Sequence, residues 1–137
     1  MGNRRRSREI ALQVLFQSEF EPDLTWERAT ALFTENFETP VEVKEYATSL
    51  LKGVWENKQQ LDRLIQTHAR NWQLDRMGFV DRNILRLAAF EMTLMNGEIP
   101  VKVIIDEAIE IGKRYGSEDT FAFVNGVLDN ISKSLVK

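Results

Sequence analysis

The chain has 137 residues, 43% of them hydrophobic and 28% charged, with a formal net charge of −3, which is the size and composition of a single folded domain. It contains no cysteine and one histidine, His68, so disulfides, thiolate nucleophiles and cysteine-ligated metal centres are excluded. Because its apolar runs are far shorter than the ~20 residues of a membrane helix and no cleavage pattern follows the N-terminal apolar segment, we expect one cytoplasmic domain over residues 1–137, without membrane contact.

Apolar residues recur at steps of three and four along almost the whole chain, which predicts an all-α fold of about seven helices. The expected helices run, in chain order, over about residues 4–20, 25–38, 40–54, 57–68, 81–95, 100–115 and 117–131, with a turn or short helix near 71–78. Short connections of this kind favour two small packed bundles that share one core. We expect the N-terminal bundle in about residues 1–70 and the C-terminal bundle in about residues 78–137.

The last helix carries two phenylalanines close together. Ser117 is the expected N-cap, and an inner stripe starting at Phe121 leaves Phe123 nearer the edge of the buried face. A partly exposed aromatic residue beside acids such as Asp119 is typical of an anchor for a protein partner. A capped helix with bulky core residues remains the alternative. Gly126 inside this helix predicts the close approach of another helix.

The N-terminus concentrates positive charge. Arg4, Arg5, Arg6 and Arg8 place four positive charges in the first eight residues, so residues 9–137 carry −7. On a helix these guanidiniums surround one end, where they oppose the helix dipole. Arginine binds phosphate through a forked pair of donors and stacks on bases, so this arrangement favours RNA binding. A solvated, frayed terminus remains the alternative.

The remaining candidates for chemistry are weak. No nucleophile can be assigned to His68, and a single histidine excludes a carboxylate bundle with two Glu-x-x-His motifs. Glycine-rich phosphate loops are absent from the sequence. We therefore expect no catalytic residue, no metal and no cofactor. Trp26, Trp55 and Trp72 are spread over separate elements and are expected in the core.

Three segments resemble the NusB family of bacterial transcription antitermination factors over nearly the whole chain. They are the opening Arg4 to Ala11, the central run from Asp81 to Met92, and the closing run from Ile99 through Glu110 to Asp129. This resemblance implies an all-helical fold of two three-helix bundles and a role without catalysis. It implies binding to the boxA element of ribosomal RNA leader transcripts together with NusE, a small-subunit ribosomal protein, in the antitermination complex of RNA polymerase.

The resemblance also implies roles for individual residues. It assigns Arg4, Arg5, Arg6 and Arg8 to RNA binding, and we place Gln13 and Gln17, which continue the same helix, on the RNA side. It assigns Asp81, Asp119 and Phe123 to the surface that faces NusE. Some members of the family self-associate, so both a monomer and a homodimer stay open. The alternative function is a helical adaptor that binds only protein partners.

Overall fold

The computed structural model describes residues 2–35, 39–95 and 97–135. They form, in chain order, α1 (Gly2–Ser18), α2 (Trp26–Glu35), α3 (Val41–Glu56), α4 (Lys58–His68), the short 3₁₀ helix η1 (Leu74–Arg76), α5 (Phe79–Thr93), α6 (Val101–Tyr115) and α7 (Thr120–Leu135). The described residues contain no strand, so the predicted all-α fold with seven helices is confirmed. None of these helices is long and apolar enough to cross a membrane.

The helix ends differ from the expected ones in a few places. The expected continuation of the second helix falls on residues 36–38, outside the described residues. The last helix begins at Thr120, three residues after the expected N-cap Ser117. The Thr120 hydroxyl donates to the Asp81 carboxylate, 2.7 Å away, and accepts from the backbone N–H of Ser117 at 2.9 Å. The expected stop after α5 is marked by Gly97, which has a φ of +76°.

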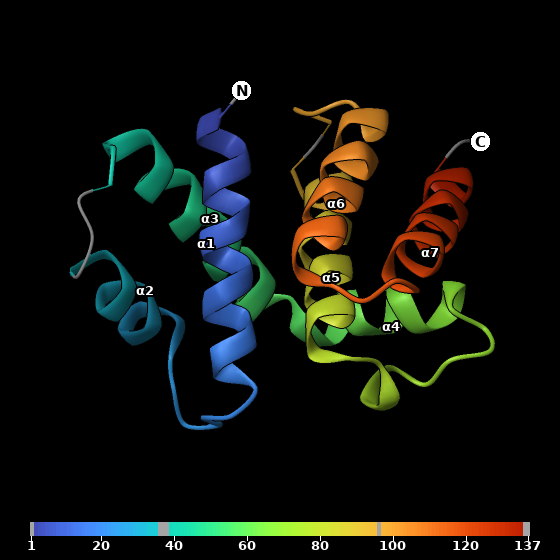
Figure 1. Ribbon diagram of the computed structural model, residues 1–137, viewed down its shortest axis with the longest axis horizontal. Coiled ribbons are helices and arrows are strands. Elements are labelled where there is room, and N and C mark those ends of the chain that lie inside the picture. Colours follow the sequence, from blue (N-terminus) through green and yellow to red (C-terminus); the bar gives the residue numbers. More distant parts are fainter. Residues whose placement is uncertain (1, 36–38, 96, 136–137) are drawn as a thin grey trace.

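The helices form two groups that are joined by α4. Helices α1, α2 and α3 pack together on one side of the molecule, and α5, α6 and α7 on the other (Figure 1). The boundary expected near residue 70 assigns α4 to the first group. In the structure α4 contacts α5 and α7 as well as α3, so it bridges the two groups.

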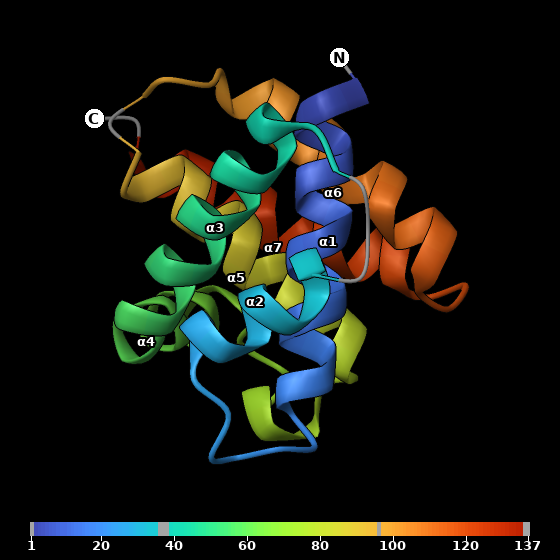
Figure 2. The same ribbon diagram turned by 90° about the vertical axis from the view of Figure 1, so that its left-hand side faces the viewer.

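Helix α5 is the central element. All ten residues from Asn83 to Met92 are buried, and the helix contacts α1, α3, α4, α6 and α7. Figure 2 shows α1 beside α3, with α5 behind them. Most of the buried hydrophobic side chains of both groups belong to one continuous cluster around α5. The two groups therefore share one core.

Two expectations about aromatic residues are wrong. Phe121 is 45% exposed and Trp72 is 56% exposed. On α7 the inner positions belong instead to Thr120, Val124, Val127, Leu128 and Ile131. Because the hydroxyl of Thr120 is bound to Asp81 and its methyl group lies against α6 at Gly112, the next residue, Phe121, is turned outward.

The glycine that allows close helix packing is Gly53 on α3, and not Gly126. A Cβ atom at Gly53 would lie 2.1 Å from the nearest atom of the Phe90 ring on α5, whereas a Cβ at Gly126 would meet nothing within 4 Å. Gly126 is exposed on α7. Close approach of α3 and α5 therefore depends on the missing side chain at position 53.

Gly53→Ala is expected to lower the free energy of unfolding by about 1 to 3 kcal/mol, because the added methyl group overpacks the contact with Phe90. Gly126→Ala is the matched control and is expected to raise it by up to about 1 kcal/mol, the helix-propensity difference. Urea denaturation followed by circular dichroism measures both. Stabilisation by both variants would contradict the packing described for Gly53.

Candidate nucleic-acid interface and partner surface

Three of the four N-terminal arginines are exposed at the start of α1. Arg4 lies with its guanidinium carbon 4.5 Å from the centre of the Tyr46 ring. Arg6 is exposed and forms no ion pair within the described part of the chain. Arg5 is paired with Glu107 on α6, but its side chain remains 48% exposed. These three guanidiniums form a basic end that a polyanion can reach.

Arg8 does not belong to this exposed group. Its side chain is 5% exposed and donates to Glu91 on α5 through Nε at 2.9 Å and Nη2 at 2.8 Å. Its Nη1 lies 3.4 Å from Glu107. The sequence groups Arg8 with the other arginines, but its guanidinium is buried in the structure. Arg8 therefore holds the start of α1 on α5, and a direct phosphate contact would require this pair to open.

The carboxylate of Glu91 has a second donor, Tyr46 on α3. The Tyr46 hydroxyl donates to Glu91, and burial together with this carboxylate raises the pKa of Tyr46 above its ordinary value. Burial alone would lower the pKa of Arg8, but the hydrogen bonds and charge of Glu91 outweigh it, so the pKa of Arg8 is raised. Both groups keep their protons at neutral pH. The network joins α1, α3 and α5 directly beneath the basic end.

Gln13 and Gln17 lie on the outer face of α1. Both are exposed, and their spacing from Arg6 of seven and eleven residues places all three on one stripe of the helix. The Gln17 amide donates to Glu21 at 3.2 Å. The two glutamines are therefore in line with one exposed arginine.

An apolar groove of about 480 Å³ lies at the other end of α1. It is lined by Leu12, Gln13, Phe16, Gln17, Phe20, Val80 and Tyr115. The rings of Phe16, Phe20 and Phe79 pack edge to face, with centroids 5.1 to 6.1 Å apart. Phe16 is 40% and Phe20 is 61% exposed. Exposed aromatic rings gathered at a groove are typical of a site for a protein partner.

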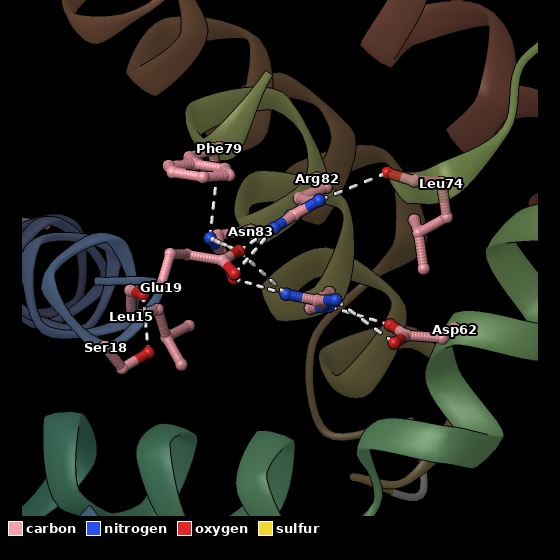
Figure 3. Close-up of polar contacts among 9 residues, drawn as sticks. Leu15, Ser18, Glu19, Asp62, Leu74, Phe79, Arg82 and Asn83 are labelled. Carbon is pink, nitrogen blue, oxygen red and sulfur yellow. Dashed lines mark hydrogen bonds and ion pairs between the residues drawn. The ribbon is translucent and has the colours of Figure 1, made fainter. Parts of the chain in front are cut away.

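Glu19 fixes the chain at this groove. Its carboxylate accepts from Arg82 Nε at 2.7 Å and from Asn83 at 2.9 Å, and it lies 3.2 Å from Arg86, which also pairs with Asp62 on α4 (Figure 3). Burial would raise the pKa of Glu19, but the hydrogen bonds from Arg82 and Asn83 outweigh it and lower that pKa. Phe20 follows Glu19 directly, and Arg82 lies over the Phe79 ring. The ion pairs therefore hold the aromatic rings in place.

The three residues expected to face a partner lie where α5 and α7 begin. Asp81 accepts a hydrogen bond from Thr120, and exposed Asp119 immediately precedes α7. Phe123 is half-buried and packs edge to face on exposed Trp72, with ring centroids 5.4 Å apart. Val80, next to Asp81, lines the apolar groove. Asp81 thus follows a residue of the groove at the start of α5.

The described residues contain no group of three or more histidine or carboxylate side chains that could hold a metal ion. The His68 ring nitrogen Nδ1 lies 2.9 Å from the carbonyl oxygen of Leu64, one turn earlier on the same helix.

Sequence reasoning missed the carboxylates that pair with the arginines. Glu91 lies 83 residues from Arg8 and Glu107 lies 102 residues from Arg5, so no local spacing reveals either pair. One signal was present. Arg86 and Glu91 stand within the apolar run of α5, and a charge in such a run indicates a buried ion pair.

A family model described as the NusB family matches residues 5–133. The chain belongs to the NusB family. Among its relatives, the transcription antitermination protein NusB of Desulfatibacillum aliphaticivorans is 46% identical, over all of this chain and 94% of that protein. NusB of Anaeromyxobacter dehalogenans strain 2CP-1 is 48% identical, over 98% of this chain and 93% of that protein. The family is one of antitermination factors and not of enzymes.

Solved NusB structures share the fold. NusB from T. maritima is 42% identical and superposes with a TM-score of 0.85, covering 95% of this chain and 90% of that one. A NusB-like chain in a crystal structure of the antitermination factors NusB and NusE with double-stranded RNA is 28% identical, with a TM-score of 0.86 over 98% of each chain.

Glu19→Gln is expected to lower the free energy of unfolding by about 2 kcal/mol at pH 7, the worth of hydrogen bonds to a charged group. Because the folded-state pKa of Glu19 is lowered, this stabilisation is present above the unfolded value of about 4.3 and is lost as the pH falls through the folded value. Urea titrations from pH 7 to pH 3 should show the difference shrinking. Glu56→Gln on exposed α3 surface is the control; a pH-independent difference for Glu19→Gln would refute the ion-pair assignment.

Proposed function

We propose that this NusB chain is an RNA-binding transcription antitermination factor that binds boxA RNA of ribosomal RNA leader transcripts together with NusE. The supporting observation is the exposed basic end of α1, formed by Arg4, Arg5 and Arg6 on an otherwise acidic body. A chain 28% identical to this one occurs in a complex of NusB, NusE and RNA. Binding to nascent transcripts places the protein with RNA polymerase in the cytoplasm.

The basic end and the outer stripe of α1 form the RNA-binding part of this proposal. Arg4, Arg5 and Arg6 bind phosphates, and Gln13 and Gln17 offer amide groups for hydrogen bonds to RNA farther along the helix. Arg8, which the resemblance also assigns to RNA, acts here through Glu91 by holding the start of α1 in place.

The groove and the acidic residues beside it form the part that binds NusE. The rings of Phe16 and Phe20 supply exposed apolar area, and Asp81, Asp119 and Phe123 continue the surface across the starts of α5 and α7. This composition fits a protein surface that offers apolar side chains to the groove and basic side chains to the carboxylates. The basic end and the groove lie toward opposite ends of α1, which allows both partners to bind together. Gln13 and Gln17 also line the groove, so they lie where the two partners meet in this proposal.

Three exposed guanidiniums are expected to give a slope of about −2 when log affinity for single-stranded boxA RNA is plotted against log salt. Arg6→Ala removes one phosphate contact and should make the slope less steep by about 0.7. Filter binding with and without NusE measures both values. Lys133→Ala on α7 is the control for loss of one exposed cation and should leave the slope unchanged. Equal slopes for the wild type and Arg6→Ala would remove Arg6 from the phosphate contacts, and absence of RNA binding by the wild type would favour the protein-only adaptor.

Phe20→Ala is expected to weaken NusE binding at least tenfold, because exposed aromatic anchors carry much of the energy of an interface. Asp119→Ala should weaken it by about fivefold through the lost charge. Leu135→Ala is the control, since this apolar side chain is also exposed but lies at the C-terminal end of α7, away from the groove and from Asp119 and Phe123. Calorimetric titration with NusE, combined with thermal melting of each variant, makes the comparison. Unchanged affinity for Phe20→Ala would remove the groove from the interface.

A further inference from the structure

Arg5 differs from its exposed neighbours in having a carboxylate at its guanidinium. Its Nε donates to Glu107 Oε2 at 3.2 Å, and its Nη2 donates to the same oxygen. Arg4 rests on the Tyr46 ring instead, and Arg6 has no carboxylate partner among the described residues. The Nε and Nη2 edge is one of those with which arginine grips phosphate in a forked pair of hydrogen bonds. Glu107 thus occupies a binding edge of Arg5.

Glu107 is held in place independently of Arg5. Its side chain is 16% exposed, and Nη1 of buried Arg8 lies 3.4 Å from its Oε1 atom. Arg8 is in turn fixed by Glu91. When Arg5 turns away, Glu107 therefore keeps a cationic neighbour, so opening the Arg5 pair does not strand a buried charge.

The pair with Arg5 lies at the surface, where it is weak and exchangeable. The Arg5 side chain is 48% exposed, and Glu107 raises the pKa of Arg5 above its ordinary value. An exposed pair of this kind contributes little to folding stability. A phosphate group offers the same guanidinium edge a full negative charge in exchange, so it competes directly with Glu107.

We propose that Glu107 sets the RNA affinity of the basic end by competing with RNA phosphate for Arg5. In the free protein Glu107 neutralises this guanidinium, and bound RNA displaces it. Glu107 is therefore an affinity-determining residue that opposes binding, and this inference rests on the proposed RNA-binding function. The three exposed arginines are not equivalent: Arg6 binds phosphate without a competitor, whereas Arg5 must first exchange its partner.

Glu107→Gln tests this competition in the full chain with boxA RNA and NusE. The amide keeps the shape but removes the charge, so RNA affinity should rise about fivefold, the upper worth of an exposed ion pair. In an Arg5→Ala background the same substitution should give no gain, because the competed group is absent. Glu110→Gln, one turn along α6 and paired with Lys113, controls for loss of an acidic charge and should change affinity less than about twofold.

Thermal melting of each variant reports whether Arg8 and Glu91 still hold the fold. Lower affinity in Glu107→Gln, or an equal gain with and without Arg5, would overturn the competition. Absence of wild-type RNA binding would instead overturn the proposed function and this inference with it.

Discussion

Charged side chains on the buried central helix must be paired, and helix α1 supplies partners at two places. An uncompensated charge at Glu91 or Arg86 on α5 would cost several kcal/mol. Arg8, near the start of α1, neutralises Glu91, and Glu19, just after its end, neutralises Arg86 together with Arg82. Because these two groups of ion pairs, at Arg8 and at Glu19, are separated by most of the helix, they fix both the direction and the register of α1 on the core.

This pairing positions both exposed surfaces of α1. The ion pair of Arg8 with Glu91 lies directly beneath the exposed arginines at one end of α1. The ion pairs of Glu19 hold the turn that carries Phe20 at the other end. A rotation of α1 by one residue would separate Arg8 from Glu91 and would change which side chains of α1 face outward. The positions of the basic end and of the aromatic groove therefore depend on the ion pairs of Arg8 and Glu19, although these ion pairs belong to neither surface.

Much of this architecture could be predicted from local sequence pattern, whereas the remaining features depend on contacts between residues far apart in the chain. Helical periodicity gave the number of helices and most of their bounds, because a repeat near 3.6 residues is a local property of the chain. It could not separate buried Arg8 from exposed Arg6, since both are arginines of one basic cluster and only contact with distant Glu91 distinguishes them. Likewise, the hydrogen bond from Thr120 to Asp81 turns Phe121 outward, and no pattern within α7 records a partner on α5.

Two modest surfaces suit a factor that assembles with two partners at once. In the function proposed above, three exposed guanidiniums, one of them already paired with Glu107, give weak attraction for RNA at physiological salt. If NusE occupies the groove and also contacts RNA, the second contact becomes intramolecular and its effective concentration rises without any new interaction. In the proposal above, Glu107 pairs with Arg5 and thereby lowers the affinity of the basic end for unrelated RNA. The complex with NusE and RNA gains enough affinity from its other contacts to offset this loss. Weak binding by the basic end alone is in this view a source of specificity, because stable association requires both partners.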